Sequence, residues 1–152
     1  MIRHALLCLL LAPAVAAEPA PPRSDTDVFR ALLEHREQIQ RTVKKLRNGV
    51  ETLTESSDPA VAALLRAHAT AMRGRLDDGR LINSQDPLFA ELFLHADKIT
   101  TRVEETGRGV RVVETSTDPY VVKLVQARAD VMDRFLKDGP AELQRRHELP
   151  AR

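Results

Sequence analysis

The feature that most constrains this chain is an internal repeat. Shifting the sequence by sixty positions aligns residues 27–79 with residues 87–139 without a gap. About a third of the aligned positions are identical, several times what unrelated segments give. The identical pairs include Gly49 with Gly109, Val50 with Val110, Asp58 with Asp118, Met72 with Met132 and Gly79 with Gly139. The chain is therefore expected to use one structural unit twice.

The first element of each copy reads as a helix. Apolar residues recur at helical spacing within residues 27–40 and again within residues 87–100. Asp86 and Pro87 suit the cap and the first position of the second of these helices.

A β-hairpin follows in each copy. Residues 42–46 and 50–56 are rich in Thr and Val, which favour strands. Between them, Asn48-Gly49 predicts a type I′ turn, because both central positions of that turn need positive φ. Gly107-Arg108-Gly109 takes the same place in the second copy.

The second helix of each copy begins at an Asp-Pro pair, with the aspartate as cap and the proline in the first turn. These pairs are Asp58-Pro59 and Asp118-Pro119, and glycines at 79 and 139 mark where the helices stop.

Together these elements predict an α+β fold made of tandem αββα units at residues 27–80 and 81–140. A lone hairpin with two helices hides too little apolar surface, so the copies are expected to share a core. We expect antiparallel hairpins with helices on one face and an approximate internal two-fold axis. Whether the hairpins join into one sheet stays open.

The ends of the chain read differently from its body. Residues 1–17 have a basic start, an apolar stretch and a small-residue cleavage region, which predict a signal peptide and a periplasmic or secreted protein. Residues 18–26 form a Pro-rich leader and residues 141–152 a C-terminal tail. No later segment is apolar for long enough to predict a transmembrane helix in the mature chain.

Charge argues against a nucleic-acid partner. Loss of Arg3 with the signal peptide lowers the 23 Lys and Arg to 22, which equals the 22 Asp and Glu. Cys8 would be removed too, which leaves no thiolate ligand and no disulfide. Binding to nucleic acid rests on a basic face, which a neutral chain with interspersed charges does not predict.

Three histidines and a methionine are the candidate metal ligands. The predicted helices place His35, His68 and His95 on apolar stripes, and Met72 lies one turn beyond His68. Imidazole and thioether suit copper or an axial contact to haem. The competing interpretation is structural, because a histidine or methionine on such a stripe often only packs. A pocket for an organic ligand is a third possibility.

Other polar residues have simpler explanations. Asp58 and Asp118 are expected as helix caps, and the Thr/Glu-rich strands as solvated faces. Ser56, Ser57 and Ser116 lie in no nucleophile motif, so nothing points to nucleophilic catalysis. The basic cluster Arg145-Arg146-His147 is expected to belong to a frayed, solvated end.

Two runs, GVETLTESSDPAVAALLRAHATAM and LFLHADKI…GVRVVETSTDPYVVKLVQA, resemble a group of small exported bacterial proteins with no assigned activity. The resemblance covers nearly all of the mature chain. It implies bacterial export and a duplicated fold, and it implies no reaction.

These observations favour a non-enzymatic binding protein of the bacterial envelope, which takes a small ligand or an envelope protein as partner and holds copper or haem through His35, His68, Met72 and His95. The alternative is a structural or protein-interaction module without a cofactor. An unfamiliar hydrolase is a third hypothesis, which would need a histidine and an acid in a cleft.

Overall fold

The structure, a computed structural model, describes residues 24–80 and 85–152. The predicted signal peptide and most of the predicted leader lie outside these residues. The helices are α1 (Asp25–Glu34), α2 (Pro59–Asp77), α3 (Pro87–Leu94) and α4 (Pro119–Asp138). The strands are β1 (Ile39–Leu46), β2 (Gly49–Ser56), β3 (Thr100–Thr106) and β4 (Gly109–Thr115). Short 3-10 turns follow α1, α3 and α4 at η1 (Arg36–Gln38), η2 (Ala96–Lys98) and η3 (Gly139–Gln144).

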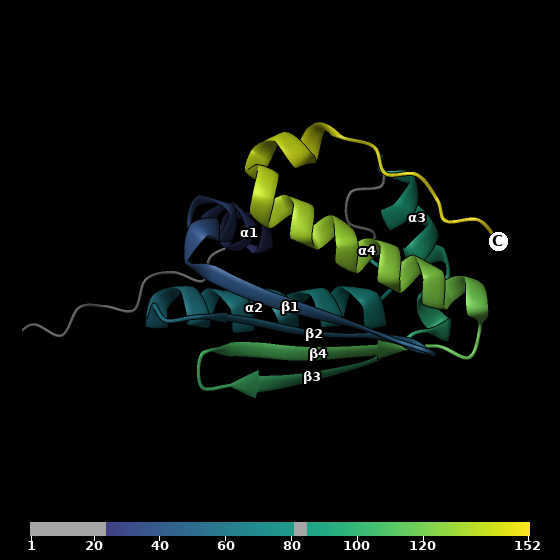
Figure 1. Cartoon of the computed structure of the whole chain (residues 1–152), viewed down its shortest axis with the longest axis horizontal. Helices are drawn as coiled ribbons and strands as arrows, with labels where there is room; N and C mark the ends of the chain where they lie inside the picture. The colour runs from purple at the N-terminus through teal and green to yellow at the C-terminus, as the bar shows by residue number, and fades with distance from the viewer. Residues whose placement is uncertain (1–23, 81–84) are drawn as a thin grey trace, which may run out of the picture.

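The strands form one four-stranded antiparallel sheet in the order β1-β2-β4-β3 (Figure 1). β2 and β4 pair over residues 49–55 and 109–115, and this pairing joins the two hairpins. The predicted α+β class is therefore confirmed, and the two hairpins belong to a single sheet.

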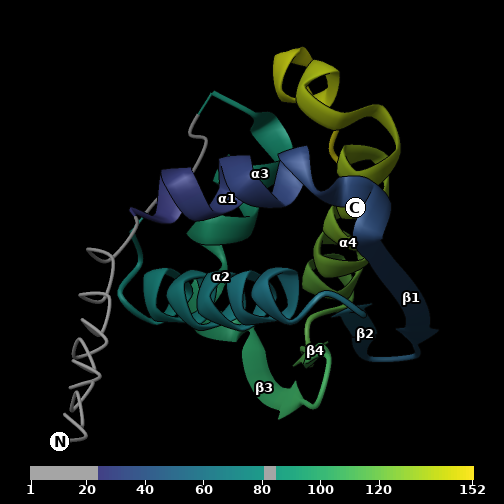
Figure 2. The same cartoon turned by 90° about the vertical axis from the view of Figure 1, so that its left-hand side faces the viewer.

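The helices cover one face of this sheet (Figures 1 and 2). Val50 on β2 and Val110 on β4 are buried beneath them, at 1% and 4% exposure. Val43 and Val103 on the outer strands share that face by register, because side chains alternate along a strand. The opposite face carries mostly Thr and charged side chains, including Thr42, Lys44, Glu51, Arg102, Glu104 and Arg111.

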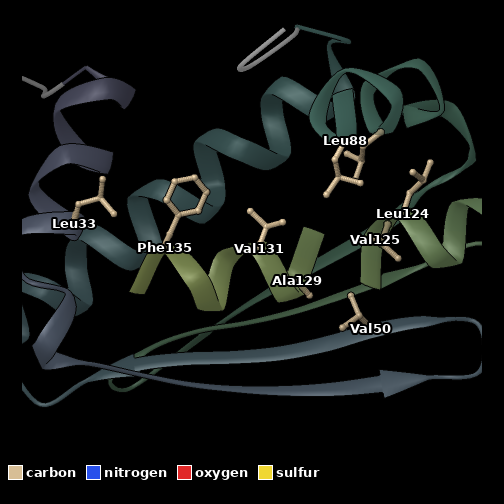
Figure 3. Packing of buried hydrophobic residues seen from close by; sticks show 9 residues of the cluster. Leu33, Val50, Leu88, Leu124, Val125, Ala129, Val131 and Phe135 are labelled. Carbon is tan, nitrogen blue, oxygen red and sulfur yellow. The ribbon is translucent and has the colours of Figure 1, made fainter. Parts of the chain in front are cut away.

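The long helices cross from one half of the chain to the other. α2 packs on β4 and β3 as well as on β2, and α4 packs mainly on β2 and β1. One core cluster joins Val61 of α2 to Val110 of β4. The other joins Leu124 and Phe135 of α4 to Val50 of β2 (Figure 3). Each half thus covers apolar surface of the other, and the expected shared core is present.

Aspartates start three of the helices in the described chain. The carboxylates of Asp58, Asp86 and Asp118 accept hydrogen bonds from backbone N–H groups of the first turn, at 2.8, 3.0 and 2.9 Å. These bonds satisfy N–H groups that have no partner within the helix. α2 and α4 end near Gly79 and Gly139, whose φ values of +64° and +62° glycine adopts without strain. The predicted caps and stops are confirmed.

The first helix of each half is shorter than the predicted 27–40 and 87–100. α1 ends at Glu34 and α3 at Leu94, and a 3-10 turn then leads into a strand. Ile39 and Ile99 are extended, with ψ of 126° and 122°, and pack against the core from there. Both isoleucines are spaced from the apolar residues of the preceding helix as if they belonged to it, because from the strand they reach the same core.

The prediction that Asn48-Gly49 forms the turn is wrong by one residue. Leu46 pairs with Gly49, so the turn consists of Arg47-Asn48, and Gly107-Arg108 forms the turn of the second hairpin. Gly49 is the first residue of β2. Its role must therefore lie outside the turn.

Gly49 and Gly109 allow β2 and β4 to approach each other closely. A Cβ atom on Gly49 would lie 1.9 Å from the carbonyl oxygen of Glu114, and one on Gly109 would lie 2.1 Å from that of Thr54. Both neighbours are backbone atoms, which cannot swing aside as a side chain can. The central strand pairing therefore requires glycine at both of these positions.

No helix in residues 24–80 or 85–152 combines the length and apolar character that crossing a bilayer requires.

Substituting alanine at Gly49 or Gly109 tests this requirement. We expect either variant to lower the free energy of unfolding by at least about 2 kcal/mol, because the methyl group overlaps a backbone carbonyl and forces β2 from β4. Gly107→Ala is the matched control, since a Cβ there meets nothing within 4 Å. Urea unfolding measures all three, and equal stability of the three variants would contradict the assignment.

Candidate functional site

Two of the predicted metal ligands, His35 and His95, lie at helix ends rather than on inward stripes. His35 is exposed at the C-terminus of α1, and its ring nitrogen lies 3.3 Å from the side-chain amide of Gln38. His95 ends α3, with Nε2 3.4 Å from a carboxylate oxygen of Glu91 and its ring edge-on to Tyr120. The stripe prediction was wrong for both because the helices stop before these residues.

His68 is the histidine that α2 does place inward. Its ring stacks on Phe29 of α1 at 5.6 Å, and Phe29 meets Phe135 of α4 edge-on at the same distance. Nδ1 of His68 is buried without a hydrogen-bond partner. Burial lowers the pKa of His68 from 6.5 to about 4; Arg128 acts in the same direction, and Asp25 opposes it. His68 therefore packs as a neutral ring at pH 7.

Met72 is half-buried one turn beyond His68. The contacts of His35, His68 and His95 involve different neighbours, and none of them joins two of the predicted ligands. Within residues 24–80 and 85–152, no three His, Cys, Asp or Glu side chains are grouped so that they could hold a metal ion. Copper or haem binding by these residues stays a prediction.

Ion pairs lie under the helices on the inner face of the sheet. Glu114 of β4 is 4% exposed and accepts from Arg128 of α4, which occupies the position aligned with His68. Arg41 of β1 pairs with Asp133 of α4, and burial lowers the pKa of Arg41. The prediction that the Thr/Glu-rich strands are only solvated is therefore wrong for Glu114, whose charge is matched inside the fold.

The C-terminal residues 145–152, here called the strap, are docked rather than frayed. After η3, the strap runs back beside α4 toward α3 (Figure 1). Lys123 of α4 donates to the carbonyl oxygen of Ala151 at 2.9 Å. Arg152 lies over the ring of Tyr120, 4.8 Å from its centre, and 3.4 Å from Glu91. The expectation of a solvated tail is therefore wrong, because polar contacts with α3 and α4 hold the strap.

A buried trio of titratable side chains, here called the latch, fastens the strap. His147 is 7% exposed, Asp86 2% and Glu142 0%. His147 Nδ1 lies 2.6 Å from Asp86 Oδ2, and His147 Nε2 lies 2.8 Å from Glu142 Oε1. The backbone N–H of His147 also donates to Asp86 Oδ2 at 3.2 Å. Since the other oxygen of Asp86 caps α3, the latch ties the strap to the start of that helix.

Two arginines complete the surroundings of Glu142. Arg134 Nε donates to Oε1 at 2.8 Å, and Arg145 donates to Oε2 at 2.7 Å while also contacting Asp138 at 2.8 Å. Burial acts to raise the pKa of Glu142, but the bonds from His147 and Arg134 and the charge of Arg145 outweigh it. The pKa of Glu142 is therefore held below its ordinary value, and its carboxylate is ionised at pH 7.

The geometry of the latch suits fastening better than proton transfer. A general base needs a ring nitrogen with a free lone pair facing its substrate. Both ring nitrogens of His147 face carboxylate oxygens, and among the described residues no hydroxyl group bonds to either of them. The imidazole instead joins two carboxylates that come from different segments, Asp86 before α3 and Glu142 in η3. The trio therefore acts as a clamp.

Beside the latch is an open cleft of about 390 Å³, here called the strap cleft. Its apolar lining is Ala127 of α4, which is half-buried, while Leu88 of α3 and Val131 of α4 lie beneath it at 0% and 1% exposure. The charged side chains that line it are Asp130, Arg134, Glu142, Arg145, Arg146, His147 and Glu148. The cleft is thus lined mainly by charged side chains of both signs, around one half-buried alanine.

Sequence reasoning did single out Arg145, Arg146 and His147, but it assigned them to a solvated tail. His147 meets Asp86, which is 61 positions away, and no periodicity links the two. The one available indication was a histidine beside two arginines, in a segment beyond the aligned residues 87–139. The expectation that chain ends fray outweighed it.

Glu142→Gln tests the latch through acid stability. Since the folded-state pKa of Glu142 is depressed, its contribution is complete above the unfolded value near 4.5 and is lost as pH falls through the lower folded value. We expect the variant to lose about 3 kcal/mol at pH 7 and to show a flatter acid decline. Urea unfolding from pH 7 to 3 measures this, with exposed Glu148→Gln as control. Parallel curves for wild type and Glu142→Gln would contradict it.

His68→Leu tests a separate pH window. The folded pKa of about 4 lies below the unfolded 6.5, so between these values the unfolded chain binds a proton that the folded chain does not. Stability should therefore fall as pH drops from 6.5 to 4, by at most about 3 kcal/mol. The leucine variant should lose most of that slope, whereas His35→Gln, at an exposed ring, should keep it. An unchanged slope in His68→Leu would refute the assignment.

No protein-family model matches the chain, and neither a curated protein nor a solved structure shows significant similarity to it.

Proposed function

We propose that this protein is an exported, non-enzymatic binding protein that holds a small ligand in the strap cleft. The observation that carries the proposal is the cleft itself, about 390 Å³ with Ala127 as its half-buried apolar residue and charged side chains around it. Ligand sites in proteins are concave and use a few polar groups to orient the ligand. The latch supports this by holding one wall of the cleft, the strap, in place.

Two features favour binding over catalysis. The ring nitrogens of His147 are occupied by Asp86 and Glu142, so the histidine at the cleft has no nitrogen to offer to a reacting group. The charges of Glu142 are matched by Arg134 and Arg145 rather than turned toward the cleft as an acid. Export to the periplasm or medium is proposed on residues 1–17, which carry the predicted signal peptide.

The proposal includes a tandem duplication around an internal two-fold axis. In the strand order β1-β2-β4-β3, each half places its first strand at an edge of the sheet and its second strand at the centre. At the centre, Thr52 pairs with Val112, the residue with which it aligns at a shift of sixty positions. Both observations support the duplication. Gly49 and Gly109 permit the same close approach. Most of the charged border of the cleft comes from the strap and η3, which lie outside the repeated residues, so the proposal expects one ligand site per chain.

Nuclear magnetic resonance tests the function. The isotopically labelled mature protein is screened against amino acids, sugars, nucleotides and dicarboxylates. We expect at least one class to shift the amide signals of Leu88, Ala127, Val131 and the strap. Ala127→Phe should abolish these shifts by filling the cleft, and Ala63→Phe, at an exposed position on α2, should preserve them. Shifts that cluster on the open sheet face, or that survive Ala127→Phe, would refute the proposal.

A further inference from the structure

The two outer strands of the sheet each have an unpaired edge. Among the strands that the structure describes, β1 pairs only with β2, and β3 pairs only with β4. In Figure 2 the two strands lie at opposite rims of the sheet, and the helices lie over the face between them. An outer strand presents a row of backbone N–H and C=O groups that can pair with a strand of another chain.

The two edges carry charges of opposite sign. β1 has three cations, among them Lys44 and Lys45, and no acid. β3 has two acids, Glu104 and Glu105, and a single cation. The shift of sixty positions aligns Lys44 with Glu104 and Lys45 with Glu105. The two edges therefore differ in sign at corresponding positions.

Lys44 is the cation of β1 whose charge is not matched within the chain. It is exposed, and among the described residues it forms no ion pair or side-chain hydrogen bond. Its neighbour Lys45, by contrast, pairs with Asp130 of α4 at 2.8 Å. A partner that offers a carboxylate beside β1 would therefore match the charge of Lys44.

The acids of β3 have partners but stay accessible. Glu104 lies 2.7 Å from Arg102, and Glu105 lies 3.7 Å from Arg66 of α2. The side chains of the two acids are 41% and 69% exposed. A carboxylate has two oxygens and accepts several hydrogen bonds, so each acid can also take a lysine from another molecule.

Strand direction allows the two edges to meet. Each strand in the order β1-β2-β4-β3 runs antiparallel to its neighbour, so β1 and β3 run in opposite directions. Two copies placed side by side in the same orientation therefore bring β3 of one copy against β1 of the next as an antiparallel pair. Because this contact joins two different edges, it leaves one edge of each kind free and can repeat along an open chain of copies.

Side-chain alternation selects the register of this pair. Lys44 and Glu104 both lie on the open face of the sheet, and Lys45 and Glu105 both lie on the helix side. With Lys44 opposite Glu104, Lys45 lies diagonal to Glu105, which is within reach of long side chains. A slip of two residues in one direction would place Lys44 opposite Arg102 instead, where the two cations repel.

Charge also decides which edges can meet. Charged residues on edge strands normally keep identical edges apart. Two β1 edges would bring cations together, and two β3 edges would bring acids together. The pairing of β1 with β3 brings opposite charges together, so the same residues favour this geometry and penalise the alternatives.

We propose that copies of this protein associate head to tail, with β3 of one copy pairing with β1 of the next in a continuous antiparallel sheet. Lys44 of one copy lies opposite Glu104 of the next. This association goes beyond the proposed function and does not depend on a ligand in the strap cleft.

Sedimentation velocity of the mature protein tests the association. We expect the average mass to rise with protein concentration up to about 1 mM at low ionic strength, because the contact is reversible. Salt at about 0.5 M should reduce the association, since it screens charges at exposed positions. A protein that stays monomeric throughout the low-salt series would overturn the proposal.

Two substitutions and their combination test the register. Lys44→Glu and Glu104→Lys should each weaken the association constant at least about tenfold, because each places like charges opposite each other. The double variant should regain most of that loss, because the reversed pair attracts again between copies. Within one chain the two positions lie on opposite edges of the sheet, so this rescue has to arise between copies.

Arg30→Glu is the control, because it makes the same change of charge as Lys44→Glu at an exposed residue of α1 that belongs to neither edge. It should associate like wild type. The substituted side chains are at least partly exposed, so all variants are expected to fold. If the single variants associate like wild type, or if the double variant does not recover, the copies do not meet through these edges and the proposal is wrong.

Discussion

The pairing of β2 with β4 is the contact on which the rest of the fold depends. It is the only strand pairing in the described chain that joins the two halves, and both strands must come unusually close for it to form. Gly49 and Gly109 permit that approach because they have no Cβ. Because β2 and β4 pair, the two hairpins form one continuous sheet. α2 can then pack on β4 and β3, and α4 on β2 and β1, so that each helix buries apolar residues of the opposite hairpin. Antiparallel sheets readily leave one face to water, and here the face without helices carries Thr and charged residues.

A second layer of the structure is electrostatic and lies at the C-terminal end. Burying Asp86, Glu142 and His147 would be costly for any of them alone, since an unpaired charge loses its hydration. Each is matched, and Arg134 and Arg145 add donors from the solvent side. Such a cluster is expected to contribute more to the position of the strap than to total stability, because matched ions gain little over apolar packing. The position of the strap in turn shapes the cleft.

Local sequence signals predicted the local structure well. Asp58, Asp86 and Asp118 cap helices because a short carboxylate before a proline can satisfy the first N–H groups, which depends on a few adjacent residues. Where two segments far apart in sequence compete, the predictions went wrong. Ile39 fits a helical stripe by spacing, but its strand partner Ser56 decides its conformation. Gly49 has the composition of a turn, but its constraint comes from Glu114 on another strand.

The candidate site was the least predictable part for the same reason. A histidine is informative only with its partners, and His147 finds Asp86 through the return of the chain after η3. The shift of sixty positions aligns His35 with His95, but an alignment says nothing about whether the two residues lie near each other. His68 was predicted to point inward and does, although its ring meets Phe29 rather than another ligand.

The exchange of helices across the sheet has a consequence for motion. Neither half can open while the other stays closed, because each keeps the other's apolar residues from water. Loss of the central strands is therefore a cooperative, global event. The strap is different, since it contributes no strand and is held by contacts at Arg145, at His147 and at its last two residues. Local opening of the strap therefore does not require the sheet to unfold, and the proposed ligand of the strap cleft would be able to enter and leave without global unfolding.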